Sequence, residues 1–580
     1  MQARFRILLT ALCALLLSGQ LHAQQPIVNV LIEGLDAQLE ANVRLFLSME
    51  QQKGHPLLSE GRIRRLHNKA PQEIAAALQP YGYYRPEITS SLNQLESGEW
   101  QARYVIDPGP GIPIAEFNLT INGEIRDDPE LKKLVEVHGL RVDAVFVHPQ
   151  YDGFKSRLRE LAAEYGYLQG KFTEARVEID LDTYQARVYL AYESSKRYSF
   201  GEVSLDQDVL DADFLRRYIT FHQGDPYNLN LLVDLKQALN NTNYFQSVEV
   251  YSDEPRHDIR EIPITVKLTP RKRNRYDIGL GFGTDTGARA KVRWFVPRVN
   301  RRGHRIDSEL MVSQNGYRVG ANYRVPVYNP RTDQLVYTIS EEKEDTDTND
   351  SLLRLVGVSL NHNRGEWREI LSLNYQSEEF EIANDNGTTS LLIPGVSWSR
   401  IWGPDFINVV DGLRFDIGLR GADSSFISDT NFTQLRGGVK FILSYDARNR
   451  LLLRGNFGTT HASDFDQLPS SIRFFAGGSQ SVRGYSYESL GPKNKDGDVV
   501  GGRHLLTSTA EFEHYFNDNW SAAVFLDTGN AIDSLSDDLE QGAGFGLRWK
   551  SPVGPVRIDL ANSISRGKNW RLHISIGPDL

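Results

Sequence analysis

Two short motifs in the second half of the chain place a basic side chain and an acidic one where they could pair. The motifs are Val482-Arg483-Gly484-Tyr485 and the pattern Phe525-Leu526-Asp527-Thr528-Gly529. Val524 and Leu526 alternate with Asp527, which puts Asp527 on the polar face of a predicted strand. An arginine and a carboxylate that meet away from bulk water form a strong, charge-assisted hydrogen bond. We therefore expect Arg483 to bind Asp527.

The arginine lies in an unusually long segment between two predicted strands. One strand ends near Phe457 and the next clear one begins at Leu505, which leaves about 47 residues between them. A loop of this length in a compact domain is usually functional. It also contains the run Arg473-Phe474-Phe475-Ala476-Gly477-Gly478. Glu511 and Glu513 face the same side as Asp527, so both are candidate additional partners of Arg483.

Two Asp-Thr-Gly triplets raise the alternative of an aspartic protease, in which paired carboxylates share a proton. The triplets are Asp285-Thr286-Gly287 and Asp527-Thr528-Gly529. The first follows a glycine-rich strand without an apolar lead-in, and alternating strands rather than two matched lobes separate them. The sequence also contains no pattern typical of a metal site, a nucleotide site or a Ser-His-Asp triad. We predict neither an enzyme nor a cofactor.

The motifs lie in a region of period-two alternation from residue 271 to residue 580. One strand carries Leu413, Phe415, Ile417 and Leu419 on one face and Arg414, Asp416 and Arg420 on the other. An apolar face and an ionic face suit a barrel wall with lipid outside and a polar lumen inside. A soluble sandwich also alternates, but the long polar loops and an apparent export signal favour the barrel. Strands of ~10 residues give an all-β transmembrane barrel of about 16 antiparallel strands.

The first and last strands of this barrel predict a weak seam. The candidate seam residues are Gly279, Gly281 and Gly283 in the first strand and Leu572, Ile574, Ile576 and Gly577 in the last. Glycine weakens a strand, and Pro578 cannot donate to a ladder. The glycines either relieve crowding inside a tilted barrel or mark a lateral gate, and the seam alone does not decide between the two.

The first half of the chain contains a pattern repeated three times. Each unit has an opening strand, helical segments and a closing hairpin, and Gly82, Gly166 and Asn243 mark the ends of the equivalent helices. Regular spacing of this kind indicates an array of small domains. We place three α+β units at residues 24–108, 109–195 and 196–270. Each leaves a sheet edge that can accept an extended peptide, although a plain spacer arm is the alternative.

The N-terminus predicts export from the cytoplasm. Arg4 and Arg6 precede an apolar stretch from Ile7 to Leu17, and Ala23 precedes a favourable cleavage point, so residues 1–23 read as a signal peptide. The chain's one cysteine, Cys13, lies inside this segment. No later apolar run reaches the ~18 residues that a membrane-spanning helix needs. The acidic balance, with a formal net charge of −10, argues against nucleic acid as the partner.

Taken together, the signal peptide, the repeats, the Val-Arg-Gly-Tyr loop and the Phe-x-Asp-x-Gly strand resemble the BamA-like outer-membrane assembly superfamily. In this superfamily POTRA (polypeptide-transport-associated) domains precede a barrel. Three repeats, the Arg473 run and the ending Gly577-Pro578-Asp579-Leu580 are similar to its TamA family. The C-terminal Leu580 departs from the terminal aromatic residue common among outer-membrane proteins.

The resemblance implies an outer-membrane insertase, with its POTRA domains in the periplasm. It also implies assembly or secretion of autotransporters and other barrel proteins through the seam, and contact between Arg483 and Asp527 inside the barrel. The implied partners are unfolded outer-membrane protein substrates, the lipid bilayer and a TamB-like inner-membrane-anchored periplasmic protein. Two alternatives remain open, namely a two-partner-secretion pore for one dedicated exported protein and a passive porin.

Overall fold

A computed structural model describes residues 27–55, 58–383, 385–403, 410–551, 554–565, 567 and 569–576. The predicted signal peptide, Gly577, Pro578 and Leu580 lie outside these residues. Contacts divide the chain into two compact units. The first holds the chain up to Val203 with residues 221–232 and 252–264, and the second holds residues 204–220, 233–251 and the chain from Thr265 onward. Among the described residues, no helix is both long and apolar enough to cross a membrane.

The first α+β domain begins with a strand and closes with a hairpin. Its elements are β1 (Val28–Glu33), α2 (Ala37–Phe46), α3 (Ser48–Gln52), α4 (Glu60–Leu78), η1 (Gln79–Tyr81), β2 (Glu87–Gln94) and β3 (Trp100–Asp107). The sheet order is β1-β3-β2, with β1 parallel to β3. Asp36 caps α2 by accepting hydrogen bonds from two backbone N–H groups of its first turn. The periodic residues Ile63, Leu66, Ala70 and Ile74 of α4 are buried against the sheet.

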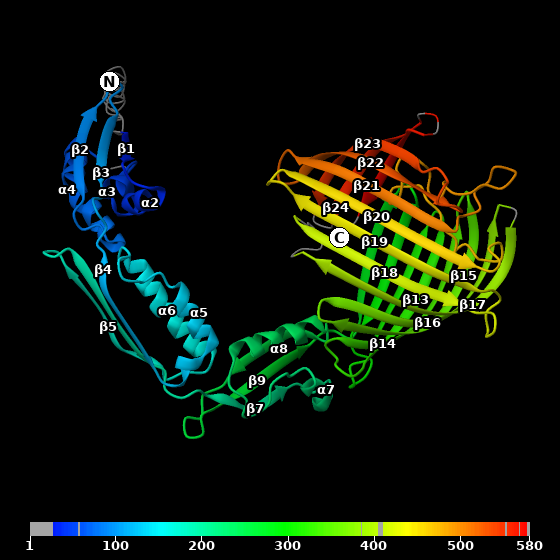
Figure 1. Cartoon of the computed structure of the whole chain (residues 1–580), viewed down its shortest axis with the longest axis horizontal. Coiled ribbons are helices and arrows are strands. Elements are labelled where there is room, and N and C mark those ends of the chain that lie inside the picture. Colours follow the sequence, from blue (N-terminus) through cyan, green and yellow to red (C-terminus); the bar gives the residue numbers. More distant parts are fainter. Residues whose placement is uncertain are drawn as a thin grey trace, which may run out of the picture. The chain divides into compact units, whose positions relative to one another are not determined.

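The second and third domains repeat this arrangement (Figure 1). The second contains β4 (Ile114–Asn122), η2 (Glu124–Asp127), α5 (Pro129–Val137), α6 (His148–Glu164), β5 (Lys171–Asp180) and β6 (Gln185–Glu193). The third contains β7 (Ser199–Asp206), α7 (Ala212–Arg216), α8 (Leu229–Asn241), β8 (Phe245–Ser252) and β9 (Glu261–Pro270). Their sheet orders are β4-β6-β5 and β7-β9-β8, so the last strand is central in all three sheets.

The remaining strands form one sheet of 16 in sequence order, which confirms the predicted α+β repeats followed by a 16-strand barrel. They are β10 (Arg275–Gly283), β11 (Gly287–Val296), β12 (Arg305–Ser313), β13 (Gly316–Pro326), β14 (Asp333–Asp345), β15 (Asn349–Arg364), β16 (Trp367–Ile382), β17 (Asp385–Trp402), β18 (Gly412–Ala422), β19 (Phe432–Ser444), β20 (Asn449–Ala462), β21 (His504–Tyr515), β22 (Trp520–Ile532), β23 (Glu540–Ser551), β24 (Gly554–Ser563) and β25 (Trp570–Ile576). All described ladders between these neighbours are antiparallel, from β10–β11 to β24–β25.

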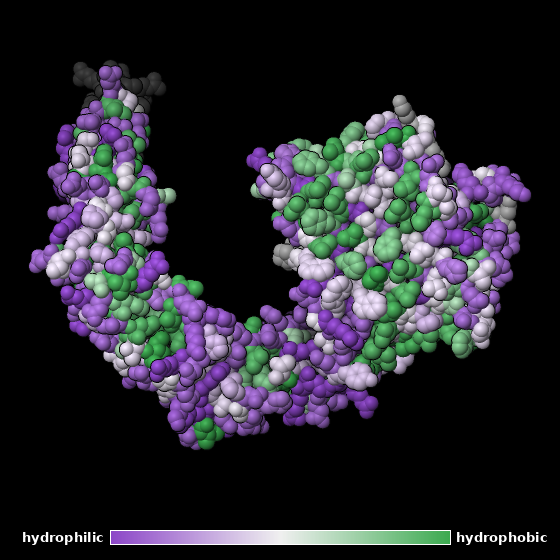
Figure 2. Space-filling model, in the orientation of Figure 1, coloured by the Kyte–Doolittle hydropathy of each residue, from purple (hydrophilic) through white to green (hydrophobic). Residues whose placement is uncertain are grey.

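The outer wall of the barrel is apolar because alternate side chains point away from the lumen. Ile278 and Leu280 of β10 are 78% and 85% exposed, and Val524, Leu526 and Leu572 are also exposed. Figure 2 shows hydrophobic side chains gathered over this wall. Polar residues alternate with them, so the glycines of β10 lie on the lumen face, where Gly279 is opposite Lys291 and Gly281 is opposite Arg289 of β11. A wall of this kind matches a lipid-facing surface.

Candidate functional site

The long loop runs from residue 463 to residue 503, between β20 and β21. It is shorter than the sequence predicted, because β20 continues through Ala462 rather than ending near Phe457. The extra strand residues pair with β19, for example Ala462 with Phe432. Hydrogen bonds to several strands hold the loop against the inner wall of the barrel, and the Arg483 motif lies within it.

Arg483 is almost fully buried and is surrounded by carboxylates. Its Nε and Nη2 donate to the two oxygens of Asp527 at 2.7 and 2.9 Å, and its backbone N–H donates to the same side chain at 3.0 Å. Its Nη1 donates to Glu511 Oε2 at 2.7 Å and to Asp559 Oδ2 at 3.1 Å. The guanidinium also lies 3.3 Å from the centre of the Phe525 ring. The structure thus brings together Arg483, Asp527 and Glu511, as the sequence predicted, and adds the Phe525 ring to them.

A second arginine shares these carboxylates. Arg548 Nη2 lies 2.9 Å from Glu511 Oε1, and Arg548 Nη1 lies 2.5 Å from Asp559 Oδ1. Glu511, Asp527, Arg548 and Asp559 come from four consecutive strands, β21 to β24. Sequence reasoning missed Arg548 and Asp559 as members of this cluster. Their positions on the polar face of alternating strands could have made them candidates, but only the strand register places them beside Glu511.

Glu513 does not join this cluster, so its predicted role as a partner of Arg483 is wrong. It accepts a hydrogen bond of 2.5 Å from Arg450 Nε and another from the Ser521 hydroxyl. Arg450 is its directly opposite residue in the β20–β21 ladder. Glu513 lies on the same face as Glu511, but two residues along a strand is a shift of about 6.6 Å. That shift places Glu513 opposite a different arginine.

The other motif residues fix the loop and the neighbouring strands in close contact. Val482 is fully buried among Ala476, Tyr485 and Leu490, and Tyr485 Oη donates to Glu540 Oε2 at 3.1 Å. Gly484 has a φ of +97°, and a Cβ there would lie 2.9 Å from the carbonyl carbon of Asn562.

Gly529 is also required by close approach. A Cβ at this position would lie 2.5 Å from the Leu506 carbonyl oxygen, so no larger residue fits without a shift of β21.

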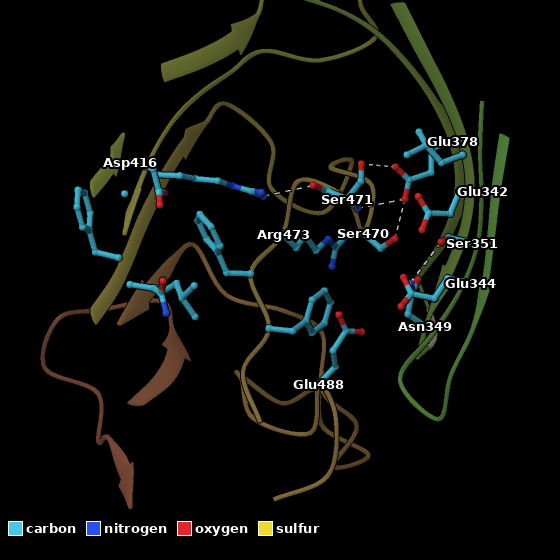
Figure 3. Close-up of a pocket in the computed structure, with 18 residues that line it drawn as sticks. Glu342, Glu344, Asn349, Ser351, Glu378, Asp416, Ser470, Ser471, Arg473 and Glu488 are labelled. Carbon is cyan, nitrogen blue, oxygen red and sulfur yellow. Dashed lines mark hydrogen bonds between the residues drawn. The ribbon is translucent and has the colours of Figure 1, made fainter. Parts of the chain in front are cut away.

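A second attachment holds the start of the loop beside a cavity of about 480 Å³, which the attachment residues help to line (Figure 3). Glu378 of β16 is fully buried and accepts a hydrogen bond of 2.6 Å from the Ser470 hydroxyl and one of 3.1 Å from the Ser471 N–H. Arg473 is also buried, and its guanidinium donates to the carbonyls of Leu468 and Val500. Because these carbonyls belong to the two arms of the loop, Arg473 ties the arms together.

The candidate seam lies between β10 and β25. Among the described residues, β10 shares a ladder with β11 and β25 shares one with β24, but the two do not pair with each other. They are nevertheless close, since a Cβ on Gly283 would lie 3.7 Å from the Ile574 carbonyl oxygen. Gly279, Gly281 and Gly283 face the lumen side of this gap, and Leu572 and Ile576 are exposed on the outer side. Gly577 lies outside the described residues.

The described residues contain no group of three or more His, Cys, Asp or Glu side chains arranged to hold a metal ion. The two Asp-Thr-Gly carboxylates are each bound by the loop rather than facing each other. Asp285 accepts hydrogen bonds from Ser479, and Asp527 accepts them from Arg483. This geometry does not resemble a shared-proton pair.

Three family models match the chain. They are the Omp85 superfamily domain over residues 299–579, POTRA domain TamA domain 1 over residues 29–108, and the surface antigen variable number repeat over residues 198–271. With the fold above, these matches define an outer-membrane β-barrel protein with N-terminal POTRA domains. The barrel region of the chain, residues 299–579, matches the Omp85 superfamily domain.

Similar curated proteins are outer membrane protein assembly factors named BamA. The BamA of Neorickettsia risticii is 22% identical over 66% of this chain, and that of Nitratidesulfovibrio vulgaris is 20% identical over 94%. The chain spans 55% and 72% of the lengths of these two relatives. A crystal structure of Haemophilus ducreyi BamA lacking POTRA domains 1–3 is similar over 80% of this chain and 99% of its own, with a TM-score of 0.67 and 16% identity. This likeness concerns the fold alone.

Proposed function

We propose that this protein is an insertase that assembles other β-barrel proteins in the outer membrane, without enzymatic chemistry. The observation that carries the proposal is the seam between β10 and β25, which share no ladder among the described residues, in a barrel that matches the Omp85 superfamily domain. Unpaired backbone groups are costly in lipid. A strand edge that is exposed there is therefore a strong template for an incoming strand.

The composition of β10 supports opening at this seam rather than elsewhere. Gly279, Gly281 and Gly283 present no side chains to the lumen, so they add no cross-strand packing on that face. The free energy for insertion then comes from strand pairing and from burial of the substrate's apolar face in lipid. This source of energy needs no nucleotide.

The finer part of the proposal concerns substrates and partner. The match of residues 29–108 to the first POTRA domain of TamA supports a role in assembling or secreting autotransporters together with a TamB-like inner-membrane-anchored protein. The three POTRA sheets each leave edge strands, to which extended segments of unfolded substrate can add. The domain limits proposed for these units are residues 24–108, 109–195 and 196–270.

A covalent lock across the seam tests the proposal. Gly283→Cys and Ser575→Cys place thiols on the lumen faces of β10 and β25, and a short bis-maleimide joins them. Ser575 is a better partner than Ile574, whose side chain alternates to the outer face. The matched control is Gly320→Cys with Ser340→Cys, which joins a glycine and a serine that already pair between β13 and β14.

The assay measures insertion of unfolded barrel proteins into vesicles containing the full chain. We expect the seam lock to abolish insertion and the control lock to leave it unchanged. Full insertion with the seam locked would refute the proposal. Depletion of the protein in cells, followed by a census of outer-membrane proteins, then separates a broad insertase from a pore for one exported protein. If depletion causes the same loss of outer-membrane proteins in cells with and without the TamB-like protein, the proposed partnership is wrong.

A further inference from the structure

The tip of the long loop, residues 479–484, contacts the β10–β11 turn on one side of the seam and β25 on the other. On one side, the Ser479 N–H donates to Asp285 Oδ2 at 2.8 Å, and the Ser479 hydroxyl donates to the same oxygen. Asp285 lies in the turn that joins β10 to β11. On the other side, the Gly484 N–H donates to His573 Nε2 of β25 at 2.9 Å. The tip therefore bridges the β10–β11 hairpin and β25, and β10 and β25 share no ladder among the described residues.

The two contacts are mechanically linked because the tip is a compact turn. The Gly478 N–H donates to the Tyr485 carbonyl at 3.2 Å, and the Ser481 N–H donates to the Gly478 carbonyl at 3.2 Å. Gly478 has a φ of +95°, and a Cβ there would lie 3.0 Å from Asp285 Oδ2. A glycine at this position lets the tip approach the β10–β11 turn closely.

Among the residues that the structure describes, few other contacts at the level of the tip join β10 to β25. The described contacts include one hydrogen bond of 3.3 Å from the Ile574 N–H to the Thr284 hydroxyl. A cavity of about 370 Å³ lies between the tip and the seam, lined among others by Phe282, Ile574 and Tyr487. Because this space is not filled by side chains, hydrogen bonds rather than packing hold the tip to the seam strands.

We propose that the loop tip is a staple that holds the seam closed from the lumen side, with Asp285 and His573 as its positioning residues. The inference rests on the proposed function of the seam and explains what keeps it shut before a substrate arrives. It also gives Asp285 of the first Asp-Thr-Gly triplet a structural role in place of the catalytic role that an aspartic protease would require.

The staple has a strong end and a weak end. Near His573, the tip is also held by the ion pairs of Arg483 with Asp527 and Asp559, which belong to β22 and β24. At the other end, Asp285 is half-buried and the described hydrogen bonds join it to a single loop residue, Ser479. Opening therefore separates the β10–β11 hairpin from the tip, and the loop stays with β21–β25.

Spin labels across the seam test this inference in the full chain in lipid vesicles. Ile278→Cys and Leu572→Cys place labels on the outer faces of β10 and β25. Asp285→Ala is expected to increase the population with a long label-to-label distance about tenfold, since a charged hydrogen bond is worth at least ~1.4 kcal/mol. Asp285→Asn keeps an acceptor oxygen and should restore most of the closed population. Asp347→Ala, in the exposed β14–β15 turn, is the matched control.

Two outcomes would overturn the staple. The first is a distance distribution for Asp285→Ala equal to those of the parent and Asp347→Ala. The second is an equal gain in the open population for Asp285→Asn and Asp285→Ala. His573→Leu gives an independent reading if Asp285→Ala does not fold, and no gain there also rejects the inference. A wider seam without any change in insertion would keep the staple and reject the proposed function, so the two failures are distinguishable.

Discussion

The side chains around Arg483 bury two guanidinium groups and three carboxylates in the barrel. Such a cluster is stable only when each charge keeps its partners, because removing one partner leaves an uncompensated buried charge. Arg483 binds Asp527 through two guanidinium nitrogens and its own backbone N–H. This buried bidentate geometry distinguishes it from half-exposed arginines such as Arg354, which water can solvate.

Arg483→Ala should therefore lower the free energy of unfolding by about 3–5 kcal/mol. Arg483→Lys should recover only part of it, because an ammonium cannot make the bidentate contact. Urea unfolding of the protein in lipid vesicles measures both. The control is Arg354→Ala, whose half-exposed ion pairs with Glu341 and Glu379 should contribute about 1 kcal/mol or less. Equal losses for Arg483→Ala and Arg354→Ala would contradict the role of the buried cluster.

Glu511 and Glu513 provide a sharper comparison, since they lie on the same face of one strand. Glu511 binds Arg483 and Arg548, whereas Glu513 binds Arg450. Glu511→Gln should speed hydrogen exchange in loop residues 477–485, because it weakens the anchor of Arg483. Glu513→Gln should leave exchange in that segment as it is in the parent. Equal acceleration by the two variants would show that the anchor is not specific to Glu511.

At the scale of elements, the residues that end the repeated helices also join one domain to the next. Gly82, Gly166 and Asn243 all have positive φ, as their positions after helices favour. The Gly82 carbonyl accepts a hydrogen bond of 2.8 Å from Ile112, and the Gly166 carbonyl accepts one of 2.9 Å from Tyr198. After Asn243, the Tyr244 hydroxyl donates to the Gly303 carbonyl of a barrel turn at 2.6 Å. The same turn of each repeat therefore serves as a junction.

Gly166→Ala should loosen the junction between the second and third domains. An alanine Cβ would lie 2.9 Å from Tyr227 Cβ, in addition to the cost of about 1 kcal/mol for a positive φ. Gly98→Ala is the control, because Gly98 has a φ of +83° and no heavy atom within 4 Å of its Cβ position. Limited proteolysis between residues 194 and 200 measures the effect. Equal cleavage of the two variants would show that the contact with Tyr227 does not stabilise the junction.

At the scale of the whole molecule, the long loop is attached to the barrel wall at three places. It is attached at Glu378 of β16, at Asp285 near β10, and at the Arg483 cluster of β21–β24. These attachments surround the lumen and include both sides of the seam. A passive porin needs an open lumen, whereas a loop tied to the seam strands suits a barrel whose wall opens sideways.

Much of this architecture could be predicted from the sequence because it depends on local patterns. Period-two alternation places Asp527 and Glu511 on the lumen face without any knowledge of the fold. The helix-ending residues Gly82, Gly166 and Asn243 reveal the repeat, since a positive φ after a helix is a local requirement. The length of the segment around Arg483 likewise identifies it as a functional loop.

The tertiary structure alone decided which side chains meet. Arg548 and Asp559 join Glu511, and Glu513 turns to Arg450, because the strand register sets which lumen-facing residues lie opposite each other. Asp285 meets Ser479 and Gly484 meets His573 across 194 and 89 residues of sequence. Alternation fixes the face on which a residue lies but not its height along the barrel. The sequence therefore determined the wall, the repeats and the loop, and the register of the 16-strand sheet determined the contacts that hold the loop across the seam.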